Sequence, residues 1–123
     1  MGASLYERLG GEAAIMAAVD LFYEKVLADP LTRPYFDGVD MEVQSRKQVA
    51  FMTHAMGGPE SQRGGDLRAA HAHLVKQRGL SDAHFDAVVR HLSDTLRDLG
   101  ISANDRAEAI TVISRTRDQV LDR

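Results

Sequence analysis

The chain has 123 residues, a formal net charge of −3 and no cysteine, with 44% hydrophobic and 27% charged residues. This length and composition predict one folded domain over residues 1–123 with a real hydrophobic core. Without cysteine there is no disulfide, thiolate metal site or cysteine nucleophile, and without a clustered surplus of Lys and Arg no nucleic-acid partner is expected. No hydrophobic run approaches the ~20 residues of a membrane span, and the N-terminal residues lack a secretory pattern, so we expect a cytoplasmic protein.

Hydrophobic spacing predicts a short leading helix followed by a long one. Ser4 and Glu7 have the spacing of an N-terminal capping box, and Gly10-Gly11 ends the helix that follows. From Glu12 to Ala28, hydrophobic residues recur at steps of four, three and four, so they share one face of a helix that Asp29-Pro30 ends. This face consists of Ile15, Val19, Phe22 and Val26.

The middle of the chain predicts an irregular corner and another helix. Residues 31–40 combine Pro34 and Gly38 with aromatic residues, which is typical of a turn that buries its aromatic side chains. Asp40 can then cap a helix that extends to about Met56, where a Gly-Gly-Pro sequence ends it.

Three further helices are predicted in the second half. Asp66 caps the first, Ser81 starts the second, and Ser102 starts the third. No segment alternates with the period of two that strands require, so the class is all-α with five or six helices. The expected inward faces are Leu67, Ala70, Leu74 and Val75 on the first helix, Phe85, Val88, Val89, Leu92, Leu96 and Leu99 on the second, and Ala107, Ile110, Ile113 and Val120 on the third.

Two glutamines lie on one stripe of the helix that follows Asp40. Gln44, Gln48, Phe51 and Ala55 follow one another at steps of four, three and four. If this stripe faces inward, both amides need partners from a ligand or a neighbouring hydroxyl, because an unsatisfied buried polar group costs about 1–3 kcal/mol. In the alternative interpretation both glutamines face water, and the buried side consists of Val43, Ala50 and His54.

His71 lies where the hydrophobic pattern calls for an aliphatic residue, four positions after Leu67 and three before Leu74. A histidine on a hydrophobic face is either a core residue with satisfied ring nitrogens or a ligand, and periodicity leaves both possibilities open. The remaining histidines show no metal-binding arrangement and are expected to be surface or packing residues: His54, His73, His84 and His91.

Seven segments, in order and with matching loop lengths, resemble the truncated haemoglobins of the first, cyanobacterial-like group. The resemblance covers most of the chain and implies a two-over-two helical sandwich around a haem b group. The segments are SLYERLGG near the start, FYEKVL at Phe22 to Leu27, the Tyr35-Phe36 corner, VDMEVQSRKQVAFM from Val39 to Met52, Gly57-Gly58, RAAHAHL around His71, and GLSDAHFDAV from Gly79 to Val88.

The same resemblance implies a role for individual residues. His71 would be the proximal ligand of the haem iron, and Phe36 matches the aromatic residue that packs on the porphyrin face. Tyr23, Gln44 and Gln48 would surround the bound gas, where their hydroxyl and amide groups stabilise charge on dioxygen and so favour high affinity and slow release. The hydrophobic wall would contain Phe51, Leu74, Phe85 and Val89, for which ordinary core packing is the alternative.

Two positions depart from the family's pattern. Some relatives carry a distal histidine where this chain has Lys47, and two roles stay open for it. As a neutral amine it can bind iron, although removing its proton at pH 7 costs about 5 kcal/mol before a bond forms; as a cation it can instead pair with a haem propionate. Relatives that attach haem covalently use a histidine in the last helix, where this chain has Thr116, so the haem is expected to be non-covalent.

In function, the resemblance implies a monomer that binds dioxygen, nitric oxide and carbon monoxide. Several family members convert nitric oxide to nitrate, and because this chain has no GxGxxG nucleotide-binding motif, such an activity would depend on a separate electron-donating reductase. Two alternatives stay open: a gas sensor or store without turnover, and a cofactor-free helical interaction module.

Overall fold

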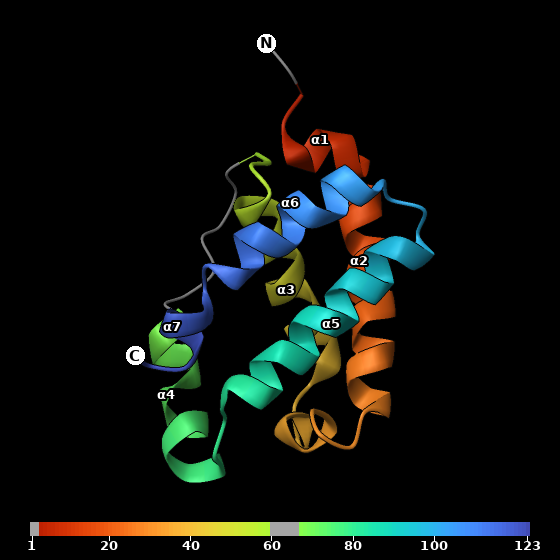
Figure 1. Ribbon diagram of the computed structural model, residues 1–123. Helices are drawn as coiled ribbons and strands as arrows, with labels where there is room; N and C mark the ends of the chain where they lie inside the picture. Colours follow the sequence, from red (N-terminus) through yellow and green to blue (C-terminus); the bar gives the residue numbers. More distant parts are fainter. Residues whose placement is uncertain (1–2, 60–66) are drawn as a thin grey trace.

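The chain folds into helices that pack in two crossing layers (Figure 1). The computed structural model describes residues 3–59 and 67–123, and for residues 67–70 the backbone alone, so the predicted Asp66 cap lies outside the described residues. No strand occurs in the part of the chain that is described. The elements are α1 (Leu5–Leu9), α2 (Gly11–Ala28), the 3-10 helix η1 (Arg33–Phe36), α3 (Met41–Ala55), α4 (Leu67–Arg78), α5 (Asp82–Asp98), α6 (Ala103–Ser114) and α7 (Arg117–Val120).

Helix α2 carries the centre of the core. The predicted face of Ile15, Val19, Phe22 and Val26 is buried, with 0–6% of each residue exposed. The helix packs against both α3 and α5, so each of these side chains is removed from water and contributes about 1.5–3 kcal/mol. The all-α prediction and this core face are therefore confirmed.

The corner between α2 and α3 is ordered by local hydrogen bonds. The Asp29 carboxylate accepts a bond from the Leu31 amide at 2.9 Å, and the buried Thr32 hydroxyl donates to the Val26 carbonyl at 2.7 Å. At the other end, Asp40 caps α3 as predicted and accepts bonds from the first-turn amides. Between these ends, the aromatic residues of η1 are half-buried.

The C-terminal helices differ from the prediction in three respects. The single last helix is split into α6 and α7, because the Thr116 amide and hydroxyl both bond the Ile113 carbonyl and end the regular pattern. Ala107 is exposed, and Ala109 is buried in its place. Leu99 is 40% exposed, because α5 ends at Asp98 and leaves this residue at the cap.

Helices α2 and α4 lie on opposite sides of the molecule (Figure 1). Helix α4 packs chiefly on the short C-terminal helix α7, and Arg117 of α7 is anchored to α5 through Asp82 and Asp86 at 2.9 and 2.6 Å. The C-terminal helix α7 thus connects α4 to α5 and stabilises this side of the fold. Among the described residues, none of the helices has the length and hydrophobicity to cross a membrane.

Candidate functional site

A buried hydroxyl and an amide meet between α2 and α3. Tyr23 is 5% exposed, and the Gln44 Nε2 atom donates a hydrogen bond to its Oη atom at 3.1 Å. The glutamine stripe of α3 therefore faces inward at this point and finds the partner that a buried amide needs. The alternative, in which both glutamines face water, is wrong for Gln44, and the His54 side chain that it placed in the core is exposed.

Aromatic neighbours fix the ring of Tyr23. The Phe22 ring lies edge-on at a centroid distance of 5.1 Å, and the Phe36 ring of η1 also lies edge-on, at 5.6 Å. Burial raises the pKa of the Tyr23 hydroxyl, and the hydrogen bond from Gln44 opposes this shift in part. The hydroxyl thus stays protonated at neutral pH, and because its oxygen accepts from Gln44, its own proton is left to donate.

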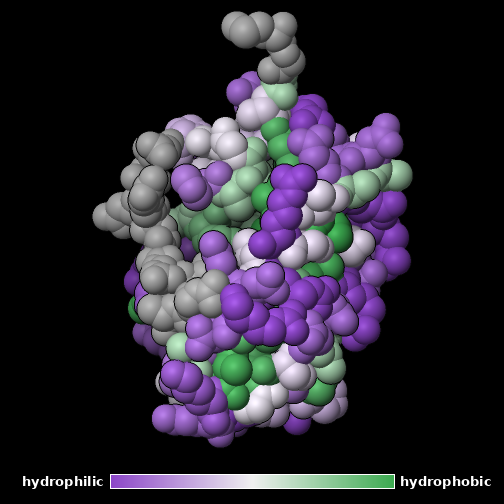
Figure 2. Space-filling view, turned by 60° about the vertical axis from the view of Figure 1, so that its left-hand side comes forward, coloured by the Kyte–Doolittle hydropathy of each residue, from purple (hydrophilic) through white to green (hydrophobic). Residues whose placement is uncertain are grey.

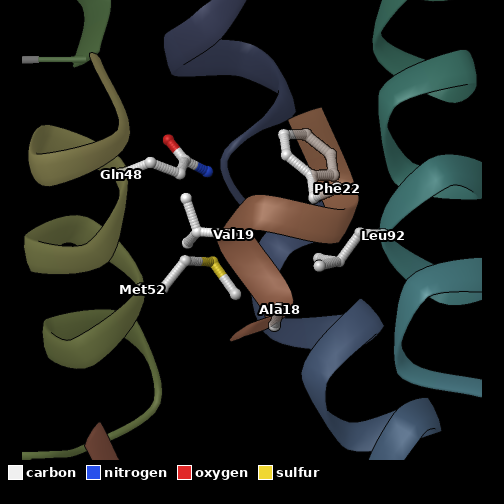
Figure 3. Close-up of a pocket in the computed structure, with 6 residues that line it drawn as sticks. All are labelled: Ala18, Val19, Phe22, Gln48, Met52 and Leu92. Carbon is white, nitrogen blue, oxygen red and sulfur yellow. The ribbon is translucent and has the colours of Figure 1, made fainter. Parts of the chain in front are cut away.

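Gln48 lies one turn further along α3, beside a small hydrophobic cavity between α2, α3 and α5 (Figure 3). The cavity has a volume of about 10 Å³, enough for one water-sized molecule. Gln48 is its only polar lining residue among those described. The other lining residues are Ala18, Val19, Phe22, Met52 and Leu92. The sequence interpretation did not identify Met52 as part of the site, although its step of four from Gln48 is the signal that could have done so.

His71 lies on a different helix from the Tyr23–Gln44 pair and from the residues that line the cavity. It is half-buried on α4, as is Leu74 one turn further on. The structure does not bring His71 into contact with the Tyr23–Gln44 pair, since α2 and α4 lie on opposite sides of the molecule (Figure 1). The described residues contain no group of three His, Asp or Glu side chains placed to hold a metal. A metal held by His71 would therefore take its other ligands from a cofactor.

Several hydrophobic side chains of η1, α3 and α5 are only half-buried. Phe36, Phe51, Val88 and Val89 pack against the core on one side and keep their other side accessible. On the face turned forward in Figure 2, hydrophobic surface is likewise exposed between hydrophilic side chains. A flat macrocycle needs such a lining, so hydrophobic walls and a single imidazole fit a porphyrin. Phe85 differs, because it is buried with the Arg117 guanidinium over its ring at 4.6 Å.

Lys47 is exposed on α3 and makes no ion pair with the described residues. The other histidines are surface or packing residues, as expected: His54 and His73 are exposed, and His91 bonds Asp29 at 2.7 Å. His84 is half-buried and caps α5 by accepting a hydrogen bond from the Ser81 amide at its Nδ1 atom.

Comparison with known proteins places the chain in one family. The bacterial-like globin family model matches residues 4–122. A group 1 truncated haemoglobin of Chlamydomonas moewusii is 50% identical over 119 residues, which cover 97% of this chain and 68% of that protein. The group 1 truncated haemoglobin of Synechocystis is 44% identical over 109 residues, 89% of this chain and 88% of that protein.

Solved structures agree with this assignment. The 2/2 haemoglobin of Synechococcus sp. PCC 7002, in the cyanomet state with covalently attached haem, has a TM-score of 0.95 and 45% identity and covers 98% of this chain and 100% of that one. The THB1 protein of Chlamydomonas reinhardtii has a TM-score of 0.86 and 46% identity, with 98% of each chain covered. Fold and site thus define a haem-binding globin of the two-over-two kind. The chain belongs to the bacterial-like globin family, as a group 1 truncated haemoglobin.

Proposed function

We propose that this globin binds dioxygen reversibly and, with electrons from a separate reductase, converts nitric oxide to nitrate. The observation that carries the proposal is the hydrogen bond from Gln44 to the buried Tyr23 hydroxyl, which leaves the tyrosine proton available beside hydrophobic side chains. Haem supplies the reversible binding of diatomic gases and the redox chemistry. The chain itself supplies a ligand, a hydrophobic lining and aimed hydrogen-bond donors.

Each part of the site has one task in this proposal. His71 holds the iron from α4, and Phe36 packs on the porphyrin while its edge-on contact keeps the Tyr23 ring in place. Tyr23 donates its proton toward the space where negative charge develops on dioxygen, and Gln44 fixes the direction of that hydroxyl. Gln48, at the border of the cavity, provides a second amide donor. Phe51, Leu74 and Val89 exclude water, and Phe85 supports the wall from inside.

A comparison of spacing supports the distal assignment. Solved structures of the truncated haemoglobin of Tetrahymena pyriformis include variants at one tyrosine and two glutamines. The three substituted positions have the same spacing as Tyr23, Gln44 and Gln48 in this chain, 21 and then four residues.

The activity can be tested by mixing the ferrous, oxygen-loaded protein with nitric oxide in a stopped-flow instrument. We expect conversion to the ferric form with one nitrate formed per haem, since both oxygen atoms pass to nitric oxide and iron loses one electron. Ferrous protein with bound nitric oxide, released dioxygen and no nitrate would contradict the dioxygenase activity and leave a gas-binding protein without turnover. A colourless protein that binds hemin without a defined Soret band would contradict haem binding altogether.

Lys47 is proposed to pair with a haem propionate, because its side chain is exposed on α3 and unpaired among the described residues. The Lys47→Ala variant is expected to lose haem faster by at most about fivefold, as the loss of an exposed ion pair of 0.2–1 kcal/mol predicts. Its ferric spin state at neutral pH should equal that of the wild type. A low-spin ferric spectrum that appears at high pH in the wild type and vanishes in Lys47→Ala would instead assign the lysine to iron.

Non-covalent attachment of haem is also part of the proposal. Thr116 lies near the position of the attaching histidine in relatives, and its hydroxyl is engaged with the Ile113 carbonyl at 2.7 Å. Extraction with acidified butanone is expected to remove all colour from the protein, and colour that stays with the protein would contradict this. The proposal further includes a monomer that works in the cytoplasm, and light scattering tests the first of these points.

A further inference from the structure

The corner η1 and the C-terminal end of α4 are joined by two reciprocal hydrogen bonds. The Tyr35 hydroxyl donates to the main-chain carbonyl of Arg78 at 2.8 Å, and the Arg78 Nη2 atom donates back to the Pro34 carbonyl at 2.8 Å. The Arg78 guanidinium also lies over the Tyr35 ring, 5.4 Å from its centroid. Two segments about 43 positions apart in sequence are therefore joined by hydrogen bonds donated from each side.

His84 extends this contact into α5. Its Nδ1 atom accepts from the Ser81 amide at 3.1 Å, so in the neutral ring the proton is on Nε2. The Nε2 atom is 3.4 Å from the Tyr35 Oη atom, and the two rings meet edge-on with centroids 5.0 Å apart. The Tyr35 hydroxyl can thus accept from His84 while it donates to Arg78, which fixes its orientation.

The bond to Arg78 acts on a weak point of α4. Arg78 is the last residue of this helix, and the final carbonyl groups of a helix have no partner within it. Helix α4 otherwise packs chiefly on the four-residue helix α7. The Tyr35 hydroxyl therefore provides a hydrogen-bond partner for a helix-end carbonyl and connects the C-terminal end of α4 to η1.

The two aromatic residues of the corner contact two different helices of the site, α2 and α4. Phe36 contacts Tyr23, whereas Tyr35 contacts Arg78, which lies two helical turns, or about 10 Å, beyond His71. A shift of η1 would move both contacts together. The corner thus links the helix that carries Tyr23 to the helix that carries His71.

We propose that the Tyr35–Arg78 contact is a latch that sets the position of α4, and with it His71, relative to the wall that carries Tyr23. Tyr35 and Arg78 are positioning residues: they determine how firmly haem is held and the strain on the bond between iron and histidine. This inference rests on the proposed role of His71 as the iron ligand. It adds to that role a specific determinant of the ligand's placement.

The test compares Tyr35→Phe with Tyr6→Phe in the haem-loaded protein. Both changes remove one tyrosine hydroxyl, but the Tyr6 hydroxyl makes no hydrogen bond with the described residues and lies on α1, away from α4. For Tyr35→Phe we expect haem transfer to an acceptor apoglobin to be about fivefold faster, from the loss of one hydrogen bond between the hydroxyl and the Arg78 carbonyl. We also expect the iron–histidine stretching band of the ferrous protein to shift, and the last amides of α4 to exchange hydrogen faster. Tyr6→Phe should change none of these.

A double-mutant cycle with Arg78→Ala separates the latch from general destabilisation. Arg78→Ala keeps the main-chain carbonyl and removes the guanidinium, so the two changes together should accelerate haem loss by less than the product of the single effects. Faster haem loss with an unmoved stretching band, or unchanged exchange at the end of α4, would overturn the latch. A stretching band that persists in His71→Gly would instead overturn the ligand assignment, and the exchange of α4 amides in Tyr35→Phe would still report on the contact itself.

Discussion

Replacement of His71 by glycine is expected to lower the affinity for haem by at least about 100-fold, because loss of a supporting partner of a metal ligand alone costs about 10–100-fold. The ferrous carbon monoxide spectrum should lose its sharp Soret band, and added imidazole, which fits the space left by the side chain, should restore it.

His73→Gly provides the matched control. This residue lies two positions further on the same helix and is exposed, so the change carries the same cost of glycine in a helix, about 1 kcal/mol, without touching the site. The control variant should keep the wild-type spectrum. Equal behaviour of the two variants would mean that the effect comes from weakening α4, and that His71 is not the ligand.

The parts of the fold that could be predicted are those encoded locally. The face of α2 from Ile15 to Val26 follows from spacing alone, because a single helix face needs only its own periodicity. The caps at Ser4 and Asp40 follow from the chemistry of one side chain and the amides two or three residues further on.

The parts that could not be predicted depend on contacts distant in sequence. Periodicity could not decide which way Gln44 faces, since its partner Tyr23 lies 21 residues earlier and on another helix. The break between α6 and α7 depends on Thr116 turning back to Ile113, which a helical pattern of hydrophobic residues does not reveal. The pairing of Tyr35 with Arg78 has no sequence signal, because each residue alone is ordinary at its position.

The identity of the site shows the same limit. An imidazole on a hydrophobic helix face is compatible with core packing, and only the resemblance of seven segments gave His71 a role. The structure adds physical support from the other wall, where a buried hydroxyl has an amide donor and two aromatic neighbours. Such a preorganised donor in a hydrophobic site is costly to keep unless it serves a ligand.

Replacement of Tyr23 by phenylalanine is expected to accelerate the release of dioxygen by about 10–100-fold. A hydrogen bond to a charged acceptor contributes about 1.5–3 kcal/mol, and each 1.4 kcal/mol changes a rate or equilibrium tenfold. The ring stays in its packing with Phe22 and Phe36, so the change removes the hydroxyl alone. The measurement is displacement of dioxygen by carbon monoxide in a stopped-flow instrument, with Tyr6→Phe as the control for loss of a hydroxyl elsewhere.

The pH dependence of release provides a second, independent test of the same hydroxyl. Because burial raises the pKa of Tyr23 above its ordinary value of 10.0, the donor is present at all lower pH values and is lost only as the pH rises through the raised pKa. The wild-type release rate should therefore be flat through pH 9 and increase only beyond pH 10, whereas Tyr23→Phe should be fast and flat throughout.

The Tyr23→Phe variant also leaves the Gln44 amide without its acceptor, so its free energy of unfolding should fall by about 1–3 kcal/mol, and Gln44→Leu in the same chain should recover part of that loss. A release rate that Tyr23→Phe does not change would show that the hydroxyl does not reach the gas, and that the hydrogen bond from Gln44 only stabilises the fold.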